Sequence, residues 1–287
     1  MIELKNVCTC RGGQPVLRDF SGCFSEGITA ILGPASGGRN DLLRVLAGVA
    51  SPRSGQILWD GAPLSSRRRR LAVGYLPARF DFYGFLRVEE VLTQAHALRG
   101  LPRKNRPRQI ALALEQVGLQ ELGESRVSSL DGDAHRRLAL AVALLGDPDT
   151  LLLAGPEREL APDSALLIDA RLRDWGRRKT VLLASGDPLF AGALAEQFLL
   201  LRGGALFCRG DRREAASWAE GRAFHLPAGL DLPEDALVTG RVLVDGRPFT
   251  RFLSARQPVG EQVEPTPGEG CLCALQGLIR EEVEGDA

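Results

Sequence analysis

Short apolar runs predict strands in the first third of the chain and again after residue 150. Residues 2–7 alternate apolar and polar side chains, as a half-buried strand does, and residues 28–32 form a continuous apolar run. The runs at 151–153 and 181–183 are typical of strands that are buried on both faces of a parallel sheet. The remaining strand-like segments are 57–59, 73–76, 198–202 and 205–208.

Apolar side chains at helical spacing follow several of these strands. Residues 42–49 predict a helix directly after a glycine-rich loop, and residues 165–175 predict a crossover helix between two buried strands. Residues from about 87 to 145 predict three further helices. Strands that alternate with helices in this way predict an α/β fold with a parallel sheet and a strand-rich N-terminal part.

The composition changes near residue 213. Residues 242–244 and 249–253 flank Asp245-Gly246, which is a hairpin signal, and residues 255–270 are rich in Pro, Gly and Glu. We therefore expect a large domain at 1–212, with a helical subdomain at about 79–145, and a small α+β appendix at 213–287 that ends in a loose tail.

Charge and hydropathy exclude some classes of partner. The chain of 287 residues has 36 basic and 36 acidic side chains, so its formal net charge is zero and nothing indicates a nucleic-acid partner. The run Arg67-Arg68-Arg69-Arg70 is local, and we expect it to be a solvated loop. No stretch approaches the ~18–20 apolar residues of a spanning helix, and the start lacks the layout of a signal peptide. We expect a cytoplasmic protein that reaches a membrane only through a partner.

The cysteines do not indicate a metal site. Two C-x-C pairs are present, Cys8 with Cys10 and Cys271 with Cys273, but zinc sites use C-x₂-C spacing and no histidine lies near either pair. Residues i and i+2 of a strand share one face. We therefore expect Cys8 and Cys10 to be packing residues and no metal to be bound.

The most informative motif is the glycine-rich loop after residues 28–32. A phosphate loop has the pattern G-x-x-x-x-G-K-[ST], in which backbone N–H groups cradle phosphates, the lysine reaches the outer phosphates and the hydroxyl holds Mg²⁺. Here the glycines have the required spacing, but Arg39 replaces the lysine, and Asn40 and Asp41 replace the hydroxyl residues. The strand, loop and helix predict a P-loop nucleotide-binding fold whose helix points its positive end at an anion. The expected, vestigial nucleotide-binding residues are Gly33, Pro34, Ala35, Ser36, Gly37, Gly38, Arg39, Asn40 and Asp41.

Further segments, in the same order along the chain, resemble motifs of ATP-binding cassette (ABC) proteins. Residues 151–156 resemble the Walker B strand, which ends D-E-P, and residues 74–78 resemble the segment that ends in the Q-loop glutamine. Residues 127–138 resemble the signature motif, L-S-G-G-Q followed by basic residues. The signature residues here are Leu130, Asp131, Gly132 and Asp133. The resemblance covers residues 1–210, and residues 263–266 resemble the C-terminal segment of the subgroup that pairs with separate membrane subunits.

The resemblance implies that the reaction centre has lost its chemistry. Ala78 stands at the position of the Q-loop glutamine, Ala154 at that of the Walker B aspartate and Gly155 at that of the catalytic glutamate. Gly186 stands at the position of the switch histidine. Mg²⁺ would lose its protein ligands, and the missing general base is typically worth ~10²–10⁴-fold in rate. We therefore expect no catalytic residue, no Mg²⁺ and at most weak binding of ATP.

Three more substitutions affect the sites of a cassette pair. Ala161 replaces the D-loop aspartate, and Arg11 replaces the aromatic residue that stacks on adenine. Asp131 replaces the serine that faces the γ-phosphate across the dimer, where a carboxylate ~4 Å away would be repelled by ~4 kcal/mol at an effective dielectric of 20.

These features predict a nucleotide-binding subunit of an ABC membrane transporter that does not hydrolyse ATP. The chain would be a structural or regulatory partner of a transmembrane subunit and of a second, competent cassette, and would lie on the inner face of the membrane. One alternative is an active ATPase that uses Glu157, Glu159 or Asp187 as its base. Another is a soluble sensor that binds anionic nucleotide without Mg²⁺.

An aromatic segment follows the Q-loop position. In the family this segment meets the membrane subunit, and aromatic residues suit an interface anchor. They could instead fill the junction between the core and the helical subdomain. The candidate interface residues are Phe80, Phe82, Tyr83, Phe85 and Leu86.

Overall fold

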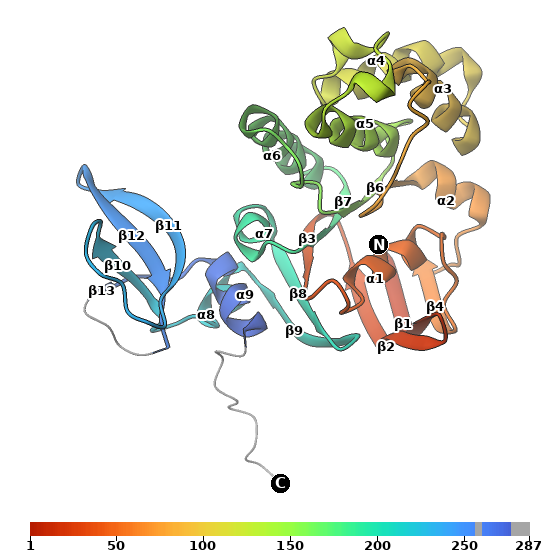
Figure 1. The fold of residues 1–287 in the computed structure, drawn as a ribbon. Coiled ribbons are helices and arrows are strands. Elements are labelled where there is room, and N and C mark those ends of the chain that lie inside the picture. Colours follow the sequence, from red (N-terminus) through yellow and green to blue (C-terminus); the bar gives the residue numbers. More distant parts are fainter. Residues whose placement is uncertain (256–259, 277–287) are drawn as a thin grey trace.

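The computed structural model describes residues 1–255 and 260–276 of the chain. Within them the strands form three sheets (Figure 1). The central sheet has the order β5-β6-β7-β3-β8-β9, and every neighbouring pair is parallel except β8 and β9. Its strands are β3 (Gly27–Leu32), β5 (Val73–Leu76), β6 (Thr150–Ala154), β7 (Thr180–Ser185), β8 (Gln197–Arg202) and β9 (Ala205–Asp211).

The strands β3, β6 and β7 are buried on both faces, as their continuous apolar runs predict. Along β6, Leu151 and Leu153 pack into one hydrophobic cluster and Leu152 into the other, because successive side chains of a strand point to opposite faces. The first cluster includes side chains of the helices between residues 88 and 194, and the second includes α1 (Arg39–Leu46) and the N-terminal antiparallel sheet. That sheet has the order β2-β1-β4 and consists of β1 (Ile2–Arg11), β2 (Gln14–Phe24) and β4 (Ser54–Trp59).

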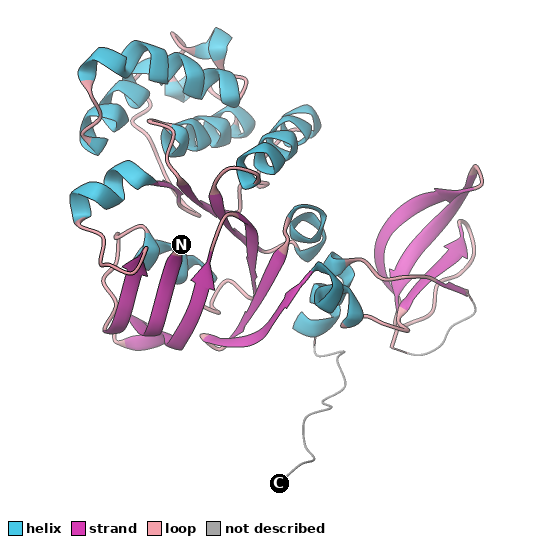
Figure 2. Ribbon diagram, turned by 180° about the vertical axis from the view of Figure 1, so that it is seen from behind, coloured by secondary structure: helices cyan, strands magenta, loops and turns pink. Residues whose placement is uncertain are grey.

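The three helices predicted before residue 145 are present and form a separate helical layer beside the sheet (Figures 1 and 2). They are α3 (Val88–Arg99), α4 (Arg106–Gln116) and α5 (Gly132–Leu144), joined through the short 3₁₀ turns η1 (Arg103–Asn105), η2 (Gln120–Leu122) and η3 (Val127–Ser129). The crossover helix is α6 (Pro162–Gly176), and α7 (Pro188–Leu194) follows β7.

Two expectations for the N-terminal half are wrong. The arginine run lies in a helix, α2 (Ser66–Ala72), whose N-cap Ser65 accepts a hydrogen bond from the N–H of Arg68, so it is not a loop. Cys10 is exposed and Cys8 is half-buried, so neither is a core residue. A register shift in β1 between Leu4 and Val7 reverses which positions face inward, and the two cysteines are left on the outer face.

The C-terminal part contains the expected hairpin. Strands β11 (Leu237–Val244) and β12 (Arg247–Leu253) pair across Asp245 and Gly246, which have φ of +49° and +75° as a type I′ turn requires. With β10 (Ala223–Pro227) and β13 (Glu261–Gln262) they form an antiparallel sheet of order β11-β12-β10-β13. Figure 1 shows helices α8 (Arg212–Ser217) and α9 (Pro267–Leu275) between this sheet and the central one.

The expectation of a loose tail is wrong for residues 260–276, because helix α9 lies in this segment and packs tightly. Its glycines allow very close packing: a Cβ at Gly268 would lie 2.7 Å from the carbonyl oxygen of Pro188, and one at Gly270 would overlap the carbonyl oxygen of Ala215. The side chains of Cys271 and Ala274 are fully buried in the same cluster as the central sheet. Residues 256–259 and 277–287 of the predicted tail lie outside the described residues.

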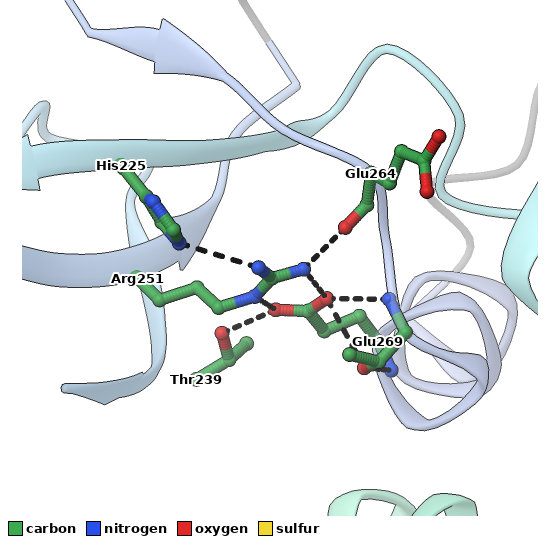
Figure 3. Close-up of polar contacts among 6 residues, drawn as sticks. His225, Thr239, Arg251, Glu264 and Glu269 are labelled. Atoms are coloured by element: carbon green, nitrogen blue, oxygen red, sulfur yellow. Dashed lines mark hydrogen bonds and ion pairs between the residues drawn. The ribbon is translucent and has the colours of Figure 1, made fainter. Parts of the chain in front are cut away.

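A buried ion pair joins α9 to the C-terminal sheet (Figure 3). Glu269, 1% exposed, accepts hydrogen bonds from Arg251 Nε at 2.7 Å, Arg251 Nη2 at 2.8 Å and Thr239 Oγ1 at 2.6 Å. Burial raises the pKa of Glu269, but the bonds from Arg251, Thr239 and the Thr266 N–H outweigh it and lower that pKa overall. Arg251 Nη1 also lies 3.2 Å from His225 Nε2. The pKa of His225 is lowered, mainly by burial and to a smaller extent by the positive charge of Arg251.

Candidate nucleotide site

The glycine-rich loop connects β3 to α1 at the carboxyl end of the parallel sheet. Gly33 and Gly38 have φ of +143° and +93°, which L side chains rarely adopt. A Cβ at Gly38 would lie 2.7 Å from Leu17 Cδ2 and 2.8 Å from the Val16 carbonyl oxygen. Pro34, Ala35 and Ser36 at the loop tip are exposed. The backbone of a phosphate loop is therefore present.

Arg39 is turned into its own loop. Its side chain is 4% exposed, and its Nη1 donates a hydrogen bond to the carbonyl oxygen of Gly33. Its Nη2 lies 3.1 Å from the position that a Cβ of Gly186 would occupy, and its buried Nε has no hydrogen-bond partner among the described residues. Burial, with the nearby cation of Arg158, lowers the pKa of Arg39. The guanidinium therefore lies between Gly33 of the loop and Gly186 after β7.

Arg11 and Asp41 form an ion pair across the start of α1. Arg11 Nε donates to Asp41 Oδ1 at 3.2 Å, and Nη2 donates to Oδ2. The hydrogen bond and the charge of Asp41 raise the pKa of Arg11. Asp41 places a carboxylate in the first turn of the helix, where negative charge is favourable. Two of the substituted positions are therefore bonded to each other.

The end of β6 carries no acidic side chain at the two positions where the resemblance leads us to expect them. Ala154 closes β6, and Gly155 follows it with φ of +59°. A Cβ at Gly155 would lie 2.8 Å from Arg158 Nε, so the Arg158 side chain lies over this glycine. Ala78 is half-buried and packs against the N-terminal hydrophobic cluster.

Glu157 is an acidic side chain beside Ser185, the last residue of β7. Its Oε1 accepts a hydrogen bond from Ser185 Oγ at 2.7 Å, and its buried Oε2 has no partner among the described residues. Burial raises the pKa of Glu157. The other two acids considered as bases are placed differently: Asp187 caps α7 through the N–H groups of Leu189 and Phe190, and Glu159 is exposed.

The signature residues are engaged within the chain. Asp131 is the N-cap of α5 and accepts a hydrogen bond from the Ala134 N–H at 2.8 Å. Asp133 Oδ1 accepts from the Ala161 N–H at 2.9 Å, and its Oδ2 accepts from Ser164 Oγ at 3.0 Å. Leu130 is half-buried and Gly132 is exposed. Two carboxylates therefore lie at a helix N-terminus that would otherwise attract phosphate.

The sequence pattern gives Arg136 no role of its own beyond its place among the basic residues after the signature. It is 2% exposed and its Nη2 donates to the carbonyl oxygens of Ala154, at 2.6 Å, and Gly155. Its guanidinium carbon lies 5.2 Å from the centre of the Phe80 ring. Sequence spacing could not find this contact, because it joins α5 to a strand end through the tertiary fold.

The aromatic segment is divided between the core and the surface. Phe80, Phe82 and Leu86 are half-buried against the main hydrophobic cluster, and both rings contact His135. Tyr83 and Phe85 are 70% and 69% exposed, and their rings stack on each other with centres 5.5 Å apart.

The residues present do not fit Mg²⁺ bound to ATP. Mg²⁺ needs oxygen ligands in near-octahedral geometry. Ala78, Ala154 and Gly155 supply no side-chain oxygen. The Arg39 guanidinium is turned into the loop toward Gly33, and the Arg158 side chain covers Gly155. Within residues 1–255 and 260–276, no group of three or more His, Cys, Asp or Glu side chains could hold a metal ion.

The fold and the glycine loop define a P-loop nucleotide-binding protein of the ABC type. Residues 17–157 match the ABC transporter family model. The chain is 34% identical to the thiamine import ATP-binding protein ThiQ of Cereibacter sphaeroides, over 71% of this chain and 89% of that protein. It is 32% identical to the Nod factor export ATP-binding protein I of Rhizobium meliloti, over 91% of this chain and 86% of that protein. The chain belongs to the family of ABC transporter ATP-binding proteins.

Solved structures agree on the fold. An ATP-binding subunit of an ABC transporter superposes with a TM-score of 0.68 at 20% identity, over 75% of this chain and 91% of that one. A dimeric ATP-binding cassette in a post-hydrolysis state superposes with a TM-score of 0.66 at 20% identity, over 74% of this chain and 98% of that one. None of the helices in the described part of the chain has the length and apolar character needed to cross a membrane.

Proposed function

We propose that this chain is a nucleotide-binding subunit of an ABC membrane transporter that does not hydrolyse ATP. It acts as a structural or regulatory partner of a transmembrane subunit and of a second, competent cassette. The observation that carries the proposal is Arg39: a buried guanidinium bonded to the Gly33 carbonyl oxygen occupies the loop where an active cassette holds a lysine free for phosphate.

The charges around the loop support the same proposal. Gly155 leaves the attacking water without a base, and Asp131 uses its carboxylate as a helix cap. Oxygen ligands for Mg²⁺ are missing at Ala78 and Ala154. ATP then binds weakly or not at all, and turnover depends on the residues of the partner cassette.

The proposed partners follow from the family. The names of two similar proteins assign them to thiamine import and Nod factor export, so membrane transport is the proposed process. We assign the exposed Tyr83 and Phe85 to the contact with the transmembrane subunit, and the chain to the cytoplasmic face of the membrane.

The proposed domain division places the nucleotide-binding domain at 1–212, its helical subdomain at about 79–145, and the appendix at 213–287. The break in composition near residue 213 and the antiparallel C-terminal sheet support this division. Helix α9 lies within the appendix by sequence but packs against α7 and α8.

The test is phosphate release from the purified chain, alone and in the complex isolated from detergent-solubilised membranes. We expect no turnover above background for the chain alone, and turnover in a complex that contains a second cassette. Alanine substitution of Glu157 should leave the activity of the complex unchanged. Steady-state phosphate release by the pure chain would overturn the proposal.

Glu157 favours one alternative, an ATPase with an unorthodox base. Its carboxylate is buried beside Ser185 in the centre of the site, and burial raises its pKa toward the range of a general base. If this alternative holds, Glu157→Gln abolishes a turnover that the purified wild-type chain shows, whereas Glu159→Gln at the exposed neighbouring acid does not.

A further inference from the structure

We propose that Arg136 and Asp133 lock the helical layer of α3, α4 and α5 to the end of β6 and the start of α6, in one orientation that needs no nucleotide. The two residues belong to the first turns of α5 and connect it to separate parts of the sheet domain. The lock concerns orientation and not hydrolysis, so it stands or falls separately from the proposed function.

Arg136 connects α5 to the end of β6. Both of its acceptors are consecutive main-chain carbonyls, of Ala154 and Gly155, and the side chain is almost completely buried. Hydrogen bonds from a charged group to a buried acceptor are among the strong ones, because neither partner can exchange for water. The Phe80 ring lies against the same guanidinium, so the aromatic segment is held with the helix and the strand.

Asp133 connects α5 to α6. Its two oxygens accept from the Ala161 N–H, which is the N-cap amide of α6, and from Ser164 Oγ in the first turn of that helix. It also forms an ion pair with Arg137, at 2.7 Å, and Arg137 donates to the carbonyl oxygen of Gly118 at 2.7 Å. These bonds join α4, α5 and α6 in one continuous network.

The site substitutions make room for this lock. Gly155 has a positive φ that suits glycine, and the Arg158 side chain covers it, so no side chain at this position competes with Arg136 for the end of β6. Gly155, at the position where the resemblance leads us to expect a catalytic acid, instead accepts a hydrogen bond from Arg136 through its main-chain carbonyl. The exposed Tyr83 and Phe85 come shortly after Phe80 in the chain. Because the Phe80 ring packs on Arg136, the lock also restricts where these two exposed rings lie relative to the sheet.

Hydrogen–deuterium exchange of the full chain without nucleotide tests the lock. In the wild type, the amides of Gly155, Arg158 and Leu86 have main-chain acceptors and should be protected. Arg136→Met keeps the length and burial of the side chain but removes its donors. We expect exchange to become about tenfold faster in peptides 80–88 and 155–165, and to stay unchanged in β7.

Arg108→Met on α4 is the matched control, because Arg108 is exposed on the same helical layer and should change nothing. Asp133→Ala is a second, independent variant, which still tests the lock if Arg136→Met fails to fold. It removes the acceptor of the Ala161 N–H, so we expect faster exchange in peptide 155–165. Wild-type exchange in both peptides for either folded variant would overturn the lock. A chain that hydrolyses ATP and still shows this pattern would overturn the proposed function and leave the lock standing.

Discussion

Arg251 donates two hydrogen bonds to Glu269, at 2.7 and 2.8 Å, and this buried pair joins the C-terminal sheet to helix α9. Removing one partner of such a pair leaves the other charge buried without compensation. We expect Glu269→Gln to lower the free energy of unfolding by about 3 kcal/mol in denaturant titrations. Glu264→Gln is the control, because Glu264 contributes only its main-chain carbonyl to Arg251.

The contribution of Glu269 depends on pH in a defined direction. Its pKa in the folded chain is lower than the ordinary value, so its stabilisation is fully present above that ordinary value and is lost as the pH falls through the folded-state pKa. The difference in unfolding free energy between the wild type and Glu269→Gln should therefore be largest near neutral pH and shrink in acid. A difference that stays constant down to the acid limit of folding would contradict the assigned ion pair.

Gly270 should be intolerant of any side chain. A Cβ there would overlap the carbonyl oxygen of Ala215, so α9 would have to move away from α8. We expect Gly270→Ala to destabilise the chain by about 2–3 kcal/mol, measured by thermal unfolding. Gly240→Ala in the same C-terminal part has open space around its Cβ and should change the melting temperature little.

Introducing a glutamate at Gly155, the position expected for the catalytic glutamate, should not restore activity. At Gly155 the backbone has φ of +59° and Arg158 covers the position, so Gly155→Glu combines strain with a steric conflict. We expect a loss of about 1–3 kcal/mol in unfolding free energy and no gain in phosphate release. Gly155→Ala is the control: its small side chain reports mainly the cost of the backbone conformation, and the further loss in Gly155→Glu reports the size of the side chain. A stable, hydrolysing Gly155→Glu chain would show that the remaining machinery is intact.

Arg39 should contribute little net stability, because the lost solvation of its charge opposes its hydrogen bond to Gly33. We expect Arg39→Met to change the unfolding free energy by less than about 1 kcal/mol. In titration calorimetry with ATP, Arg39→Lys should show tighter nucleotide binding than the wild type if the guanidinium is what occupies the loop. Equal or weaker binding by that variant would argue against occupation of the loop by Arg39.

The exposed and half-buried aromatic residues should respond differently to substitution. Tyr83→Ser with Phe85→Ser removes two exposed rings, so we expect unchanged stability and loss of co-purification with the transmembrane subunit. Phe80→Ala removes a ring from the contact with Arg136 and His135 and should cost about 3 kcal/mol of stability. If the Tyr83/Phe85 variant still co-purified with the transmembrane subunit, these two residues would not form the interface.

Much of the fold follows from local patterns. The buried strands β3, β6 and β7 and the hairpin at Asp245-Gly246 appear where the apolar runs and turn residues place them. The errors have physical reasons. The register shift after Leu4 reverses the faces of β1, and helix α9 is held by glycine contacts with helices more than fifty residues away in the sequence.

The sequence by itself determined the P-loop fold and the family, because these depend on residue type and on spacing along the chain. It also places alanine or glycine, which have no side-chain oxygen, at positions 78, 154, 155 and 186. Only the tertiary structure decided where the substituted side chains go: Arg39 to Gly33, Arg11 to Asp41, and Arg136 to the end of β6. The Arg136 bonds and those of the Arg251–Glu269 pair join residues that are eighteen or more positions apart. A hydrogen bond of this kind depends on distance in space, which no local sequence pattern encodes.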